Sequence, residues 1–333
     1  MTTSDRALVL GGGGLLGAHL VRRLLQAGWR VRVLVQPGSD SPVLDGLDIE
    51  RTAGDLLGAG PELARAAAGC RAVFHCAAIT DLWAPPAKVW AVNLEGTRRV
   101  ADACLAAGVE RLVFTGSASS FQFGSRERPG DERGGFPAAY RGIAYMESKH
   151  WATRLVRRYA ADRGLDAVVV APTFLLGELD WRPSSGELIR QFVQRRMRFV
   201  SPGGRNFACA GDVAGALVAA FHRGDRGRCY IAGGHNLTYR DFFTRVARIV
   251  GDVPEPLAEL PAGAVRAAGL VGSLYGRLSG RRPPLDRRLA RLAVCGTYYD
   301  ASRAVEQLGM QRTPVDAAID QSVRSLRTYG HIG

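Results

Sequence analysis

The order of short apolar runs along the chain constrains its fold more than any other feature. Five such runs, "ALVLG", "VRVLV", "AVFHCAA", "RLVFTGS" and "AVVVAP", alternate with amphipathic stretches as far as Pro172. Strands that alternate with helices in this way form a parallel sheet with helices on both faces. We therefore expect an α/β fold built on a doubly wound parallel sheet.

The alternation ends after Pro172, and the remainder mixes glycine and proline loops, isolated helices and one late strand, "CYIAGG". A chain of 333 residues with 47% apolar content can form one large core with a smaller satellite. The sequence therefore predicts a main domain over 1–178, to which 205–235 returns. The regions 179–204 and 236–333 are expected to form a smaller substrate-binding or lid region.

The loop after the first strand, in "LGGGGLLGAHLVRRLL", carries Gly11, Gly14 and Gly17 in the spacing GxxGxxG. Glycines here let the backbone turn tightly and let a pyrophosphate approach the helix N-terminus, where free N–H groups favour an anion. Because the cluster ends the first strand and opens an amphipathic helix, it predicts a dinucleotide site. The fold is then expected to be of the Rossmann type.

The end of the second strand bears on which dinucleotide is bound. NAD enzymes usually place an acid about twenty residues after the glycine loop to hold the ribose hydroxyls, whereas this chain has Gln36. No carboxylate at that position repels a 2′-phosphate, and Gln36 and Ser39 can donate hydrogen bonds to one, although no arginine stands there. We expect NADPH rather than NADH. The alternative is that Gln36 holds either ribose, so that both NADP and NAD are used.

Three further stretches fit a cofactor groove. Asp55, after the third strand, can accept from the adenine amino group, although an Asp there can also cap a helix. Ala77 and Ala78 follow the fourth strand and are small enough to let the cofactor approach closely. Asn93 is one of three asparagines and can bridge the backbone of neighbouring strands through its donor and its acceptor, which we expect to be its main role.

The stretch "AAYRGIAYMESKHW" holds Lys149, one of two lysines in a chain that otherwise uses arginine. Tyr145 precedes it by four residues, so on a helix the two side chains share a face. A fixed positive charge lowers the pKa of a nearby phenol, which makes Tyr145 a usable proton donor and acceptor. A compact ammonium can also bind ribose hydroxyls in a narrow groove, where a planar guanidinium would not substitute. The alternative is a solvent-exposed helix pair.

These features together resemble the extended short-chain dehydrogenases/reductases, a family that includes sugar-nucleotide epimerases, dihydroflavonol-type reductases and 3β-hydroxysteroid dehydrogenases. The matching motifs occur in order: GGGGLLG, GDL, FHCAA, NLEGT, FTGSAS, Tyr145 to Lys149, and APTFLLG. Weaker matches, FACAGDVAGAL, YIAGGHNLTYRDFF and YYDASRAVEQLGM, extend the resemblance towards the C-terminus.

The resemblance implies a Ser-Tyr-Lys catalytic set. In it Ser117, after the fifth strand, polarises the substrate carbonyl and Tyr145 supplies the proton; Ser119 is the alternative serine. It also implies a homodimer formed through the helices that bear Asn93 and Tyr145. Besides the cofactor-binding residues above, the matching motifs add Leu15, Leu16, Leu56, Pro172 and Thr173.

Departures from the family pattern indicate which reaction to expect. Relatives that eliminate water carry an Asp-Glu pair after the threonine of the fifth strand, whereas this chain has Gly116 and Ser117. Epimerases typically carry an asparagine after the position matching Thr173, whereas this chain has Phe174. Arg205, however, falls where epimerases place an arginine on the diphosphate. A sugar-nucleotide epimerase with tightly bound NAD is therefore the alternative.

The expected substrate pocket is apolar and aromatic, which suits a hydrophobic ketone better than a diphosphate sugar. We therefore expect an NAD(P)H-dependent ketoreductase or alcohol dehydrogenase for an apolar or aromatic small molecule. The hypothesis of another class is a dinucleotide-sensing regulator without chemistry, against which the Tyr-Lys pair argues. The expected pocket residues are Trp83, Ser119, Phe121, Phe174, Trp181 and Arg205, with Phe123, Phe136 and Tyr140 nearby.

The composition limits which kinds of partner and cofactor the chain is expected to bind. The formal net charge is +13, but the arginines are scattered along helix-like stretches, so we expect no nucleic-acid partner. The six cysteines are widely spaced without a CxxC pair, which predicts neither a metal site nor a disulfide framework. The start "MTTSDRALVL" lacks the pattern of a secretory leader, and we expect a soluble, cytoplasmic protein.

The segment 260–284, "LPAGAVRAAGLVGSLYGRLSGRRPP", is apolar and basic together. Similar stretches in steroid- and flavonoid-type relatives lie over the substrate site or touch membranes. We expect a lid for an apolar substrate, with binding to a membrane surface as the less favoured alternative.

Overall fold

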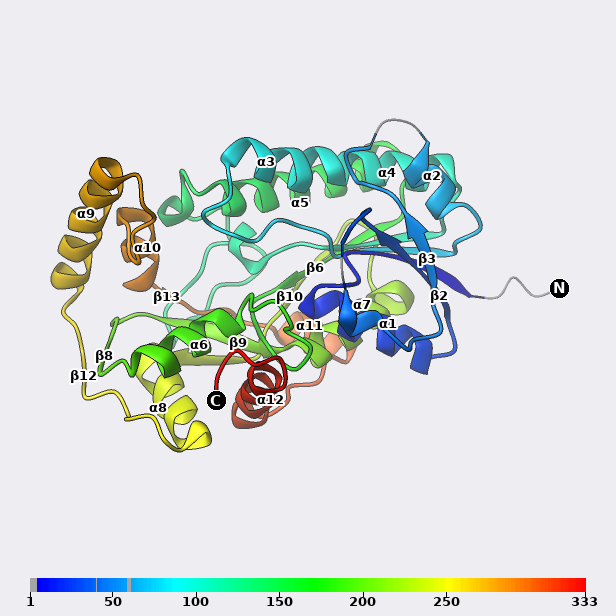
Figure 1. Ribbon diagram of the computed structural model, residues 1–333. Helices are drawn as coiled ribbons and strands as arrows, with labels where there is room; N and C mark the ends of the chain where they lie inside the picture. Colours follow the sequence, from blue (N-terminus) through cyan, green and yellow to red (C-terminus); the bar gives the residue numbers. More distant parts are fainter. Residues whose placement is uncertain (1–4, 40, 59–60) are drawn as a thin grey trace.

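The computed structural model describes residues 5–39, 41–58 and 61–333. At its centre is a seven-stranded sheet in which neighbouring strands are parallel (Figure 1). The strand order reverses between β1 and β4, so the predicted doubly wound sheet is confirmed. From one edge to the other the strands are β10 (Cys229–Ala232), β6 (Ala167–Pro172), β5 (Arg111–Thr115), β4 (Ala72–His75), β1 (Arg6–Leu10), β2 (Arg30–Val35) and β3 (Glu50–Ala53).

Helices cover both faces of this sheet, as the alternating pattern predicts (Figure 1). One layer contains α1 (Leu15–Gln26), α7 (Ala210–Arg223) and α11 (Ser302–Leu308). The other contains α2 (Glu62–Ala67), α3 (Pro86–Trp90), the π-helical turn η2 (Ala91–Glu95), α4 (Gly96–Ala106) and α5 (Ala144–Asp162). Short 3-10 turns are η1 (Pro42–Leu44), η3 (Ala118–Ser120) and η4 (Ala138–Tyr140).

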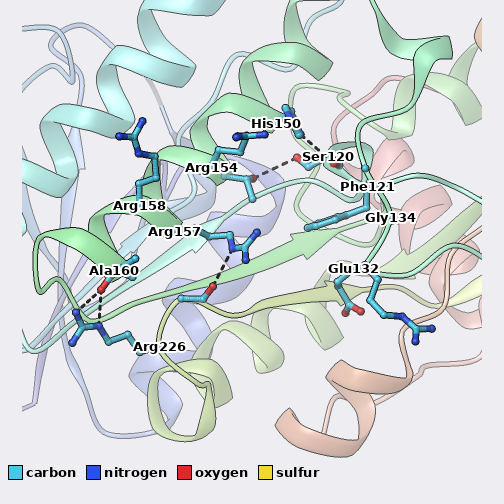
Figure 2. Close-up of a pocket in the computed structure, with 15 residues that line it drawn as sticks. Ser120, Phe121, Glu132, Gly134, His150, Arg154, Arg157, Arg158, Ala160 and Arg226 are labelled. Atoms are coloured by element: carbon cyan, nitrogen blue, oxygen red, sulfur yellow. Dashed lines mark hydrogen bonds between the residues drawn. The ribbon is translucent and has the colours of Figure 1, made fainter.

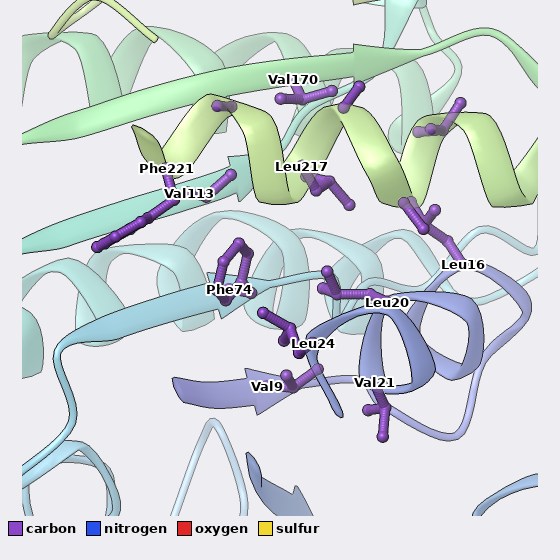
Figure 3. Packing of buried hydrophobic residues seen from close by; sticks show 14 of the residues in the cluster. Val9, Leu16, Leu20, Val21, Leu24, Phe74, Val113, Val170, Leu217 and Phe221 are labelled. Carbon is purple, nitrogen blue, oxygen red and sulfur yellow. The ribbon is translucent and has the colours of Figure 1, made fainter. Parts of the chain in front are cut away.

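Alternate strand residues build the two cores that hold these layers to the sheet. Val9, Phe74 and Val113 belong to one apolar cluster together with α1 and α7 (Figure 3). Leu8 and Phe114, their neighbours along the strands, belong to a second cluster with α4 and α5. Successive side chains of a strand point to opposite faces, so a strand covered on both faces is apolar at every position. This burial explains why these strands stand out in the sequence as continuous apolar runs.

A smaller four-stranded sheet carries most of the remaining chain. Its strands are β7 (Phe174–Leu176), β9 (Gly204–Cys209), β11 (His235–Thr238) and β13 (Gly296–Thr297). The helices α6 (Gly186–Arg195), α8 (Tyr239–Val250) and α12 (Val315–Thr328) pack on it around a third apolar cluster. The return to the main sheet is made by α7 and β10, whereas β9 pairs with β7, β11 and β13. The predicted return over 205–235 therefore includes β9, a strand that belongs to the smaller sheet.

The chain between α8 and β13 forms a separate helical pair at one end of the molecule (Figure 1). It consists of α9 (Ala262–Ser279) and α10 (Arg287–Ala293), preceded by β12 (Ala258–Glu259), which pairs with β8 (Phe199–Val200). A Cβ on Gly269 would collide with the side chain of Ala290, and one on Gly272 with the carbonyl of Leu285. Glycine therefore lets α9 lie directly against the segment that leads into α10.

Candidate active site

The glycine loop lies at the carboxyl end of β1, next to β4, where the strand order reverses. Gly11 has a φ of +83°, and a Cβ there would lie 2.6 Å from the Ala77 nitrogen. A Cβ on Gly17 would collide with the Gly11 carbonyl, whereas one on Gly14 would meet only ordinary contact with it, at 3.6 Å. The described residues thus leave space beside Gly14.

The amino end of α1 begins at Gly14 without a side-chain cap and without an acidic residue in its first turn. The first N–H groups of a helix need partners, and the helix dipole favours an anion there. Leu15 and Leu16 are buried at the start of this helix and fix it against the core. The residues present therefore fit a dinucleotide pyrophosphate.

Gln36 and Asp55 meet beyond the ends of β2 and β3. The Gln36 side-chain amide donates to one carboxylate oxygen of Asp55 over 2.8 Å, and the other oxygen accepts from the Leu57 N–H over 2.8 Å. The Ser39 hydroxyl donates to the Gln36 backbone carbonyl over 2.7 Å, and Leu56 is buried in the core. The side chain at position 36 is therefore not a carboxylate, but the Asp55 carboxylate lies directly beside it. The contact of Asp55 with adenine stays a prediction.

The segment after β4 is tied to α5 through Asn93. Its side-chain carbonyl accepts from the Ile79 N–H over 2.8 Å, and its amide donates to the Ile79 carbonyl and to the Ser148 hydroxyl, each over 3.0 Å. Asn93 thus uses both its donor and its acceptor, as expected, but it joins the segment after β4 to α5 and does not bridge the backbones of neighbouring strands. Ala77 and Ala78 are half-buried just before Ile79. Because Ser148 lies on α5 beside Lys149, Asn93 also fixes the helix that carries the Tyr-Lys pair.

The amino-terminal turns of α5 bring Tyr145 and Lys149 to the end of β5. Tyr145 is half-buried, and Lys149, one turn later, is only 3% exposed. The Lys149 ammonium donates to the Thr115 carbonyl and lies 4.4 Å from the centre of the Phe114 ring. The alternative of a solvent-exposed helix pair is therefore wrong.

The electrostatics of this pair differ from the expectation. Burial lowers the pKa of Lys149 to about 7. Burial also raises the pKa of Tyr145, and the Ser117 hydroxyl and the Arg205 charge offset part of this rise. The expectation that Lys149 lowers the pKa of Tyr145 is wrong for this arrangement. The reason is that burial of the phenol outweighs the lowering of its pKa by Ser117 and Arg205, while the Lys149 ammonium is bound by the Thr115 carbonyl.

Ser117 follows β5 and caps the short turn η3. Its oxygen accepts from the Ser119 N–H over 3.3 Å and lies 2.8 Å from the Ser119 hydroxyl oxygen. Both serines are buried. Since the Ser117 hydroxyl also interacts with the Tyr145 phenol, Ser117, Tyr145 and Lys149 come together at the end of β5, with Ser119 as the partner of Ser117.

The end of β6 is joined to the smaller sheet by asparagines. Pro172 is buried, and the hydroxyl of Thr173 donates to the side-chain carbonyl of Asn206 over 2.8 Å. The same carbonyl accepts from the Gly234 N–H over 2.7 Å, and the Asn206 amide donates to Asn236 over 2.7 Å. Asn206 and Asn236 were not predicted to belong to the site. The scarcity of asparagine, with three in the chain, was the signal that could have found them.

Arg205, on β9, faces the same region. Its Nε donates to the Tyr239 hydroxyl over 2.7 Å, and its guanidinium carbon lies 5.0 Å from the centre of the Phe174 ring. Its charge also acts on the phenol of Tyr145. Arg205 and Phe174 thus lie beside the catalytic set, and their contact with substrate stays a prediction, whereas Tyr239 was missed. The motif "LTYRDFF" held the signal for it.

Two further phenols complete this wall. Burial raises the pKa of Tyr140 to about 12, and burial also keeps the pKa of Tyr299 well above its usual value. The Tyr299 hydroxyl donates to the Phe121 carbonyl over 3.3 Å. Tyr299 was also missed, although it lies in the family-like motif that begins "YYD".

Two predicted pocket aromatics, Phe121 and Trp181, occupy other places, whereas Trp83 lies at the edge of the site. Phe121 is 5% exposed and belongs to the core of the main sheet, so its assignment to the substrate pocket is wrong. Trp181 lies at the glycine loop, where its indole N–H donates to the Gly13 carbonyl over 2.8 Å, so it too is wrongly assigned. Trp83 lies at the α10 side of the site, 5.7 Å below the guanidinium carbon of Arg288.

A separate cavity of ≈ 670 Å³ lies along another side of α5 (Figure 2). His150, Arg154 and Arg157 line it from the helix, and Arg226 lines it from the turn before β10. None of its lining residues belongs to the predicted catalytic set. The chemistry gathered at Tyr145 therefore does not use this cavity.

Comparison with known proteins agrees with this site. Residues 7–233 match the model of the NAD dependent epimerase/dehydratase family. The chain is similar to a Synechocystis protein that carries the provisional name dihydroflavonol 4-reductase, with 31% identity over 335 residues, 99% of this chain and 96% of that protein. It is also similar to sterol demethylase protein B of Methylococcus capsulatus, with 31% identity over 329 residues, 98% of this chain and 99% of that protein.

A solved structure shows the same fold. The crystal structure of gox2253 aligns with a TM-score of 0.86 and 30% sequence identity, covering 99% of this chain and 100% of its own. The ordered motifs, the doubly wound sheet and these similarities agree. The chain therefore belongs to the NAD-dependent epimerase/dehydratase family, within the extended short-chain dehydrogenases/reductases, and is an NAD(P)-dependent oxidoreductase.

Proposed function

We propose that this oxidoreductase reduces the ketone or aldehyde group of an apolar or aromatic small molecule, or oxidises the corresponding alcohol. The observation that carries the proposal is the placement of Tyr145 and Lys149 by α5 against the end of β5, beside Ser117. The names of two relatives, which refer to a flavonol and a sterol, support an apolar or aromatic substrate.

The cofactor would be held along the carboxyl ends of the strands. The glycine loop and the amino end of α1 would bind the pyrophosphate, Lys149 the nicotinamide ribose, and Thr173 the carboxamide side. When bound in its reduced form, the dinucleotide supplies the hydride. The protein supplies position, hydrogen bonds and the proton.

The proton moves from Tyr145 to the substrate carbonyl oxygen as the carbonyl carbon is reduced. The raised pKa of Tyr145 keeps its phenol protonated at neutral pH, which favours the reducing direction. The Ser117 hydroxyl donates a hydrogen bond to the same carbonyl oxygen and stabilises its developing negative charge. The Lys149 ammonium would donate to the nicotinamide ribose hydroxyls, so the charged form of Lys149 is the active one.

A lid of apolar side chains supports the substrate class. Leu292 of α10 packs with Tyr140, Ile143 and Met146, directly before and after Tyr145. This contact is made by α10, which follows the segment 260–284, so a lid formed by 260–284 itself stays a prediction. A lid of this composition would exclude water from an apolar substrate.

Our proposal for the cofactor is a preference for NADPH. The amide of Gln36 in place of a carboxylate supports it. The carboxylate of Asp55, which accepts from Gln36, opposes it, because that charge would repel a 2′-phosphate. The preference therefore depends on side chains at one point of the groove, and it is tested by a substitution of Gln36 described below.

The decisive experiment removes one hydroxyl. Tyr145→Phe should lower the kcat for reduction of a hydrophobic ketone by about 100-fold or more, because the proton donor is lost, while NADPH binding stays near normal. Tyr159→Phe is the matched control, since Tyr159 lies on the same helix and its hydroxyl donates to Asp102 instead. A Tyr145→Phe enzyme with normal turnover would refute the mechanism.

A sugar-nucleotide epimerase is the second candidate, and Arg205 is the observation that favours it. Against it, the Arg205 Nε already donates to Tyr239, and its guanidinium lies over the ring of Phe174. An epimerase should purify with NAD bound and interconvert UDP-sugars without added cofactor. The non-catalytic regulator considered above is set aside, because the chain belongs to a family of oxidoreductases.

A further inference from the structure

The helix α9 has two apolar faces, and α10 covers only one of them. Successive residues of an α-helix turn by about 100°. On that wheel Val265, Gly269, Gly272 and Gly276 fall together, and this side packs on α10 and the segment before it. The opposite side is apolar as well, over an arc of about 140°; it consists of Leu270, Val271, Leu274, Tyr275 and Leu278.

This outer face is open to solvent. Its side chains are between 49% exposed, at Tyr275, and 80% exposed, at Leu278. Within the described ranges, eight of the nine exposed large hydrophobic residues lie on α9, on β8 or directly beside β12: Leu270, Val271, Leu274, Tyr275, Leu278, Phe199, Leu257 and Leu260. Apolar surface gathered at one place in this way marks an interaction site.

The charges beside this face have one sign. Arg266 and Arg277 fall at one border of the apolar arc, and Arg281 and Arg282 follow the helix. Between Glu259 and Asp286 the sequence contains no acidic residue. A helix with an apolar face bordered by arginines fits the surface of a bilayer that contains anionic lipids, with apolar side chains in the acyl boundary and guanidinium groups at the phosphates.

Two other ways of covering this face fit less well. A symmetric dimer brings the same patch of both copies together, so the border arginines would find no acidic partner in the facing 260–285 segment. The contact with the amino end of α5 is made by Leu292 of α10, and the outer face of α9 points away from α10. The homodimer expected through the helices of Asn93 and Tyr145 stays a prediction and would not involve α9.

We infer that the outer face of α9 docks the protein on an anionic lipid bilayer. The helix lies on such a surface and does not cross it, since no helix in the described part of the chain is long and apolar enough to span a bilayer. The sequence alone favoured a lid without a membrane contact. The exposure of the outer face, which composition does not show, is the reason for the different inference.

The test is flotation of the full chain with vesicles. The wild-type chain should bind phosphatidylcholine vesicles that contain about 30% phosphatidylserine, bind pure phosphatidylcholine vesicles much less, and release in high salt. Leu274→Glu with Leu278→Glu should lower binding to the anionic vesicles about tenfold or more, because both side chains lose their place in the bilayer. Trp151→Glu is the matched control: it changes an equally exposed aromatic residue on α5 and should bind as wild type.

A second pair of variants tests the contribution of the arginines to vesicle binding. Arg277→Glu with Arg281→Glu should weaken binding to anionic vesicles several-fold, whereas Arg154→Glu with Arg158→Glu, the same charge change on α5, should not. Equal loss in both would show adsorption driven by net charge alone and would overturn the inference. So would a wild-type chain that stays unbound, or α9 variants that change the sedimentation mass of the free protein, which would assign the face to a second copy. Tyr145→Phe should bind vesicles normally, so failure of the proposed reaction and failure of docking are distinguishable.

Discussion

The helices α1 and α9 both approach a neighbour through glycine, yet they differ in what lies on their other side. On α1, Gly17 lets the helix meet the Gly11 carbonyl, and Arg23 and Gln26 face water on the far side. On α9, Gly272 lets the helix meet the segment before α10, but Leu274 and Leu278 stand exposed on the far side. An amphipathic helix such as α1 is fully explained by its own core, whereas α9 requires a partner outside the chain.

The largest effect is expected where α1 meets backbone. Gly17→Ala places a methyl group against the Gly11 carbonyl, and neither backbone segment can move without changing the loop. We expect a loss of about 3 kcal/mol or more, measured as a lower free energy of unfolding or as lost NADPH binding in a fluorescence titration. Gly263→Ala is the control on α9, because a Cβ there meets no atom within 4 Å. If Gly17→Ala binds NADPH as wild type does, the close contact between α1 and the Gly11 carbonyl does not require glycine at position 17.

The second effect concerns Lys149 and depends on pH. Its pKa in the folded protein is lowered to about 7, below the ordinary value for lysine, so the unfolded chain binds more protons between pH 7 and about 10. Stability must therefore rise with pH in this window, by about 2 kcal/mol between pH 7 and 9. Lys149→Met should abolish this rise. Urea unfolding of the cofactor-free protein at pH 7 and at pH 9 measures this change in the free energy of unfolding. An equal change in wild type and Lys149→Met would contradict the burial of the ammonium.

The same titration predicts the opposite trend for catalysis. Because the ammonium is the active form, kcat/KM for reduction should fall as the pH rises through about 7. Stability gained and activity lost over one pH window would identify a single group as the cause of both. A fall in activity without the rise in stability would assign the pH dependence to a group other than Lys149.

Most of the main sheet could be predicted from the sequence because its central strands β1, β4, β5 and β6 are buried on both faces and therefore apolar at almost every position. The edge strand β3, with the largely exposed sequence ERTA, carries no such signal. Gly11 and Gly17 were found for a related reason, since backbone contacts allow no side chain there. For Asn93 the use of both donor and acceptor was expected correctly, because a buried asparagine must satisfy both, but its partners, Ile79 and Ser148, were not. In these regions each residue type is compatible with only one structural role, so its role can be inferred from the sequence.

The site wall and the outer helices could not be predicted in this way. A large aromatic residue such as Phe121 or Trp181 is compatible with a core, a pocket or a loop contact, and only the fold decides among them. The charge on Lys149 depends on burial and on the Thr115 carbonyl, which spacing along a helix does not reveal. The exposure of Leu278 likewise follows from where α10 lies, because an apolar residue has the same sequence signature whether it is covered or open.

The smallest effect is expected at Gln36, where side chains rather than backbone decide what is bound next to α1. Gln36→Asp would set a second carboxylate beside Asp55, which now accepts from the Gln36 amide. The added charge should lower kcat/KM with NADPH about tenfold relative to NADH, because it repels a 2′-phosphate but can hold ribose hydroxyls. Gln26→Asp, the same substitution at the far end of α1, should leave the ratio unchanged. An unaltered ratio in Gln36→Asp would mean that the ribose lies away from position 36, and the choice between the two cofactors would then be made elsewhere in the groove.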